Sequence, residues 1–139
     1  HATHVAVLAR TIEAIRRLPP GDRPHTVYGC EVWRGLDWLP DSQKVALDVS
    51  GNDGLVAALN GVFDSQIAGG KRYDLAVEGR KRANATFYDS HSIDGSDKVW
   101  YALDLTPLVK DDTLTLSAFI RPFLDAFASE VEELLRAHT

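Results

Sequence analysis

The chain has 139 residues, of which 45% are hydrophobic and 25% are charged, a balance typical of one folded globular unit. Fifteen basic and twenty acidic residues give a net charge of −5, which argues against a nucleic-acid surface built on bulk positive charge. No apolar run approaches the roughly 20 residues that cross a bilayer, and the single Cys30 cannot form a disulfide within the chain. We therefore expect a cytoplasmic protein without nucleic-acid or membrane partners, in which Cys30 is buried.

The first predicted helix covers about Thr3 to Leu18, because apolar residues recur there at helical spacing and two prolines follow. His1 and His4 lie one turn apart at its start. Neutral imidazole is the commonest ligand of zinc-like ions, so the pair could hold a metal, or one histidine could bind while the other exchanges protons. Histidines near a helix start are also commonly solvent-facing or capping groups, and both interpretations remain open.

Three segments rich in β-forming residues predict strands, at 25–33, 44–49 and 99–105. Three more helices are predicted between and after them: from Asn52 or Asp53 to Ile67, from Tyr73 to Phe87, and from Thr115 or Ser117 onward. The last of these carries an aromatic stripe and has Pro122 near its first turn. Helices alternating with few strands indicate an α/β fold. Its sheet has fewer strands than a complete domain usually contains.

A second candidate site precedes the helix that starts at Tyr73. Two glycines, Lys71 and Arg72 come directly before it, and free amides together with the helix dipole make such a place suitable for a phosphate. Arg34, after the first predicted strand, could join the pocket. The alternative is a helix C-cap followed by solvated charges.

Several short segments, taken in order, resemble the C-terminal half of the PIG-L (LmbE-like) zinc-dependent N-deacetylases. They are His1 to His4 at a helix start, Tyr28 to Arg34, Phe63 to Gln66 and Tyr73 to Ala83. The stretch from Phe63 to Leu75 most resembles the version fused behind a glucosamine-6-phosphate deaminase-like domain. The resemblance implies a Rossmann-like three-layer α/β fold, here its C-terminal part with a small mixed sheet.

Members of this family remove an acetyl group from an amino sugar. A metal-bound water attacks the amide carbonyl, a carboxylate takes the water's proton, and the metal and a histidine stabilise the oxyanion. The resemblance implies that His4 is a Zn²⁺ ligand and that His1 is the catalytic helper. It is consistent with Arg34, Lys71, Arg72 and Tyr73 as substrate-binding residues, for a sugar with or without a phosphate.

The chain departs from the family pattern at two points. Ala2 and Thr3 replace the proline and aspartate of the family's His-Pro-Asp-His motif, so His1 lacks the carboxylate that would orient it. The His-Pro-Asp-Asp-Glu motif, which supplies further ligands and the catalytic base, is absent from this sequence. A catalytic zinc needs about three protein ligands, so we expect the chain alone to be inactive and to bind zinc weakly.

The chain also contains no Met and begins within its most informative motif. We therefore expect residues 1–139 to be a single domain or the C-terminal part of one, completed by a preceding part of the same protein. Three functional hypotheses follow: half of an N-deacetylase, a non-catalytic sugar-phosphate-binding or regulatory module on the same fold, or an interaction domain that forms a homo-oligomer through its aromatic last helix.

Overall fold

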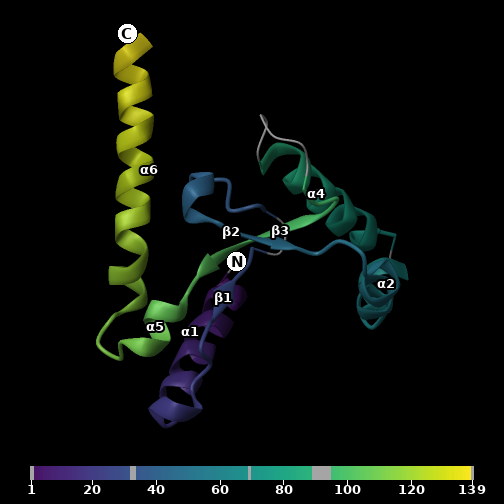
Figure 1. Cartoon of the computed structure of the whole chain (residues 1–139), viewed down its shortest axis with the longest axis horizontal. Helices are drawn as coiled ribbons and strands as arrows, with labels where there is room; N and C mark the ends of the chain where they lie inside the picture. Colours follow the sequence, from purple (N-terminus) through teal and green to yellow (C-terminus); the bar gives the residue numbers. More distant parts are fainter. Residues whose placement is uncertain (1, 32–33, 69, 89–94, 139) are drawn as a thin grey trace. The chain divides into compact units, whose positions relative to one another are not determined.

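Figure 1 shows the computed structural model, which describes residues 2–31, 34–68, 70–88 and 95–138. The chain divides into two compact units. The terminal unit combines both ends of the chain, His1–Gly29 and Asp104–Thr139, and the central unit is Cys30–Leu103. The predicted α/β class is confirmed, because the chain combines helices with one small sheet.

The terminal unit contains α1 (Ala2–Arg16), β1 (Tyr28–Gly29), α5 (Thr106–Lys110) and α6 (Leu116–His138), with a 3-10 turn at Pro20–Asp22. Its core lies where α1 packs against α5. Ile12 of α1 is 2% exposed, and Leu108 and Val109 of α5 are 0% exposed. The short helix α5 is absent from the sequence-based expectations.

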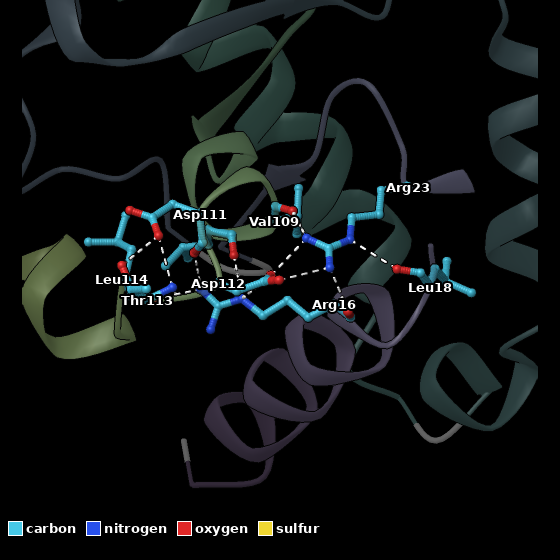
Figure 2. A network of polar contacts seen from close by, with 9 residues as sticks. Arg16, Leu18, Arg23, Val109, Asp111, Asp112, Thr113 and Leu114 are labelled. Atoms are coloured by element: carbon cyan, nitrogen blue, oxygen red, sulfur yellow. Dashed lines mark hydrogen bonds and ion pairs between the residues drawn. The ribbon is translucent and has the colours of Figure 1, made fainter. Parts of the chain in front are cut away.

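Arg16 and Arg23 connect the end of α1 with the segment around α5 through hydrogen bonds, as Figure 2 shows. The Arg16 guanidinium donates hydrogen bonds to the carbonyl oxygens of Leu108 and Leu114, both at 2.6 Å. Arg23 donates to both carboxylate oxygens of Asp112, at 2.7 and 3.0 Å. This pairing raises the pKa of Arg23 and lowers the pKa of Asp112. A planar guanidinium has several N–H groups and can donate to more than one oxygen at once. We assign this cluster a structural role.

The central unit contains β2 (Val45–Asp48), α2 (Asp53–Gly61), α3 (Asp64–Ala68), α4 (Tyr73–Tyr88) and all but the last residue of β3 (Val99–Asp104), with a 3-10 turn at Asp41–Gln43. Two buried hydrogen bonds connect α4 with β3. The Asn84 side-chain amide donates to the Val99 carbonyl at 3.1 Å, and the Tyr101 hydroxyl donates to the Asn84 carbonyl at 3.0 Å. Burial raises the pKa of Tyr101 to about 12.

The sheet has three strands in the order β1-β3-β2. β2 and β3 pair antiparallel, with Val45 opposite Ala102 and Asp48 opposite Val99. The expectation of a mixed sheet is wrong, because the three strands are antiparallel. Antiparallel neighbours need no long crossover between them, so the helices between β2 and β3 do not form the parallel β-α-β connection.

Two expectations around the first strand are corrected. The strand predicted at 25–33 is only Tyr28–Gly29 among the described residues, and Val32 and Trp33 lie outside them. Gly29 packs so closely on Leu105 that an added Cβ would lie 2.6 Å from its Cδ1 atom. Cys30, expected to be buried, is exposed and follows directly after the last residue of β1.

The helix predicted from Asn52 or Asp53 to Ile67 is two helices. Residues 62 and 63 form a turn, in which the amides of Val62 and Phe63 bond three residues back, at 3.3 and 3.0 Å. Gly61 weakens the helix just before this turn. Among the described residues, no helix is long and apolar enough to cross a membrane.

Candidate functional site

His4 lies in the first turn of α1 with its side chain exposed. His1 lies outside the described residues. Across the described ranges, no group of three or more His, Cys, Asp or Glu side chains is arranged to hold a metal ion. Of the two predicted histidines, the structure therefore describes His4, which is exposed. The described part of the chain does not supply a set of further metal ligands.

The predicted substrate-binding residues all belong to the central unit. Arg34, Lys71 and Arg72 are exposed, whereas Tyr73 is half-buried as the first residue of α4. Lys71, Arg72 and Tyr73 adjoin one another at the start of this helix, as expected. Their role in binding a substrate stays a prediction.

Arg72 has an unusual local structure. Its φ angle is 46°, in the left-handed region that few non-glycine residues adopt. Its guanidinium donates to both carboxylate oxygens of Asp74, at 3.0 and 2.7 Å. This pairing raises the pKa of Arg72 and lowers the pKa of Asp74. The carboxylate of Asp74 thus occupies the first turn of α4, where an outside anion would also be attracted.

A hollow of about 320 Å³ lies in the central unit between α2, α3 and α4. The face of α2 that lines it has the i, i+3, i+4, i+7 spacing of one helix side. Polar groups reach it from α2, from α4 and from Lys98 before β3, and apolar groups of the three helices supply the rest of the lining. The lining consists of Asp53, Val56, Ala57, Asn60, Gly61, Ile67, Asp74, Leu75, Glu78 and Lys98.

Lys98 is the centre of the polar groups at this hollow. Only 6% of its side chain is exposed, and its ammonium pairs with Asp53 of α2 and, at 2.7 Å, with Glu78 of α4. The hydrogen bond from Lys98 is the main cause that lowers the pKa of Glu78 to about 2, and the ammonium of Lys81, at 3.1 Å, adds to it. The two carboxylates in turn raise the pKa of Lys98, that of Asp53 most strongly.

The backbone also fixes Lys98 in place. Its amide donates to the Ser50 hydroxyl at 3.1 Å, and its carbonyl accepts from the Val49 amide at 3.0 Å. The cluster of Lys98, Asp53 and Glu78 therefore joins the segment before β3 to α2 and α4. Sequence reasoning missed this cluster, because its three members are far apart along the chain. The only pair with a recognisable helical spacing is Glu78 and its neighbour Lys81.

The charge of the hollow limits what it can accept. Three carboxylates and one ammonium line it, so its lining carries more negative than positive charge. Carboxylates and the Asn60 amide suit hydroxyl or amine groups, whereas they repel a phosphate. The charged groups are also paired with one another or with neighbouring arginine and lysine residues, and this is the pattern of a structural network.

Comparison with protein-family models, with curated proteins and with solved structures gives no match to this chain. The resemblance to the PIG-L family therefore rests on the ordered short segments of the sequence and stays a prediction.

Proposed function

We propose that this chain supplies part of a metal-dependent N-deacetylase that removes the acetyl group of an amino sugar. In this proposal the complete domain has a Rossmann-like fold and works in the cytoplasm. The order and spacing of the segments from His4 to Ala83 carry the proposal. The exposure of His4 in the first turn of α1 supports it, because an accessible imidazole can join ligands supplied by another part of the protein.

The described residues do not form a zinc site by themselves. They provide one exposed imidazole at the start of α1, and no cluster of further ligands accompanies it in the described ranges. The remaining ligands and the catalytic base would come from the part of the protein that carries the His-Pro-Asp-Asp-Glu motif. The contribution of this chain is then His4 as one ligand, His1 as the helper, and the segment from Lys71 to Tyr73 with Arg34 for the sugar.

The second candidate is a non-catalytic module that binds a sugar. The hollow of the central unit favours it, since its carboxylates and Asn60 could accept hydroxyl or amine groups. A phosphate on that sugar would need Lys71 or Arg34 rather than the hollow, because the lining of the hollow is negative.

Zinc binding tests the deacetylase proposal. The protein extended to include the missing motif should bind one zinc per chain by calorimetry, and His4→Ala should weaken this binding by at least about tenfold. The exposed His25 gives the control, since His25→Ala removes an imidazole of the same terminal unit outside α1. Residues 1–139 alone should bind zinc weakly and should not hydrolyse N-acetylglucosamine 6-phosphate.

Two results would contradict the proposal. One is tight one-to-one zinc binding by residues 1–139 alone that His4→Ala abolishes, because it would mean a complete site within this chain. The other is an extended protein whose zinc affinity and deacetylase activity are equal in the His4→Ala and His25→Ala variants.

A further inference from the structure

The C-terminal helix α6 carries a long apolar face. It has 23 residues, Leu116–His138, none of which is buried, and at 1.5 Å per residue it is about 34 Å long. In Figure 1 it is the yellow helix at the C-terminus. We call its apolar face the α6 stripe, which consists of Leu116, Ile120, Phe123, Leu124, Phe127, Val131, Leu134 and Leu135.

The α6 stripe repeats every eleven residues. Leu116, Ile120, Phe123 and Leu124 are followed at this distance by Phe127, Val131, Leu134 and Leu135. Eleven residues in three turns give about 3.67 residues per turn, very close to a straight α-helix. The stripe therefore runs along the helix almost without drifting, so that another straight helix can contact its full length.

The stripe is exposed from Leu124 onward, whereas Leu116, Ile120 and Phe123 are half-buried. Phe127 is 41% exposed, Leu134 57% and Leu135 61%. With Leu124 at 42% and Val131 at 39%, these five residues expose about half of their surface, which amounts to roughly 500 Å² for side chains of ~200 Å² each. Such a patch is at the upper end of what a monomer normally exposes.

We propose that α6 pairs with α6 of a second copy of this chain, antiparallel and centred between Ala126 and Phe127. Two such stripes bury roughly 1,000 Å² of apolar surface, which reaches the size at which specific interfaces begin. This inference does not depend on the enzymatic function proposed above.

The charges of α6 favour the antiparallel orientation. Glu130, Glu132, Glu133 and Arg136 give its C-terminal half a net negative charge, whereas Arg121 and Asp125 balance each other in its N-terminal half. A parallel pair would place the three carboxylates beside their own copies. In the antiparallel pair Arg121 lies at the level of Glu132 of the other copy and on the same side, because the two residues are also eleven apart. Within a Debye length of about 8–10 Å the two charges attract.

The polar face of α6 disfavours a membrane as the occupant. It carries more carboxylates than arginines, whereas helices that lie on anionic lipid are rich in lysine and arginine on that face. Arg121 contacts Asp125 within its own helix at 3.8 Å, with both side chains more than 60% exposed. So loose and solvated a pair leaves Arg121 able to attract a second partner.

Sedimentation of the chain over a concentration series tests the pairing. We expect a monomer–dimer equilibrium, and Phe127→Glu should weaken dimerisation by at least about tenfold, because a charge would enter the centre of the interface. Ser129→Glu is the matched control, since it adds the same charge on the opposite side of α6 and should leave the dimer intact. Phe127→Ala, which introduces no charge, should weaken the dimer while circular dichroism keeps the helical signal.

Charge reversal tests the orientation. At low ionic strength Arg121→Glu and Glu132→Arg should each weaken the dimer, and the double variant should restore it. In a parallel pair Arg121 does not meet Glu132, so the effects of the two reversals would simply add. A double variant that does not recover the dimer would therefore refute the antiparallel arrangement.

Three further results would overturn the pairing itself. These are a monomer at all concentrations, a dimer that Phe127→Glu and Ser129→Glu affect equally, and a monomer that binds anionic vesicles through the α6 stripe. A monomer in which Phe127→Glu makes the rest of the chain sensitive to protease would mean that the stripe is covered within one copy.

Discussion

Leu108→Ala is the sharpest test of the core of the terminal unit. Leu108 is 0% exposed and belongs to α5, which packs against α1. The substitution removes three carbon atoms, worth about 2.4 kcal/mol at ~0.8 kcal/mol each, and leaves a cavity that adds to the cost. We expect the free energy of unfolding to fall by about 3–4 kcal/mol. The Leu108 carbonyl still accepts its hydrogen bond from Arg16, so the change isolates the side chain.

Urea denaturation followed by far-UV circular dichroism measures this loss, as a lower midpoint at constant slope. Leu18→Ala is the matched control, because Leu18 belongs to the same unit and is 42% exposed, and it should cost about 0.5 kcal/mol or less. Equal losses in the two variants would refute the packing of α5 against α1 as the core of this unit.

Two other predictions concern a close contact and a charge. Gly29→Ala should lower the free energy of unfolding by about 1–3 kcal/mol, because its new Cβ would lie 2.6 Å from the Leu105 side chain. Gly21→Ala is the control, since a Cβ at that position meets nothing within 4 Å. Equal urea midpoints for the two variants would contradict the contact. The pKa of Glu78 is lowered from 4.5 to about 2, so its contribution to stability should be complete above pH 4.5 and should disappear as the pH falls toward 2. Glu78→Gln should therefore lose less stability than the wild type between these pH values in thermal melts, and parallel pH profiles would show that Lys98 does not stabilise the ionised form.

The sequence predicts helices and strands correctly where the apolar pattern and the residues that end an element indicate the same boundaries. The helix expected at Tyr73–Phe87 is α4, Tyr73–Tyr88, and the strand expected at 44–49 is β2, Val45–Asp48. The last helix begins where Thr115 was expected to cap it, since the Ala118 amide donates to the Thr115 hydroxyl at 3.1 Å. Local patterns determine these boundaries.

Two departures from the expected elements have causes that the apolar periodicity does not show. The break at residues 62 and 63 interrupts a periodic apolar pattern, and Val62 and Phe63 are 74% and 66% exposed, so burial does not hold the helix together there. The helix α5 is too short for periodicity to reveal it, although Pro107 lies in its first turn and the Asp104 carboxylate accepts from the Thr106 amide at 2.9 Å.

The candidate sites differ in the same way. Composition and spacing identify His4 and the segment from Lys71 to Tyr73, because these residues are neighbours in the sequence. Arg72, which pairs with Asp74, has a left-handed backbone angle. The sequence does not predict this angle, because arginine rarely adopts it. Lys98 meets Asp53 from 45 residues away, and no local pattern foretells such a contact.

The contacts of Arg16 also constrain how the protein can be made. Its partner Leu108 lies 92 residues further along the chain, so a long loop must close before this contact forms. During synthesis α1 leaves the ribosome before α5 and has no α5 to pack against until Leu108 has followed it. We therefore expect the terminal unit to assemble late, after translation, and premature termination before Leu108 to leave the nascent α1 as a target for chaperones and proteases.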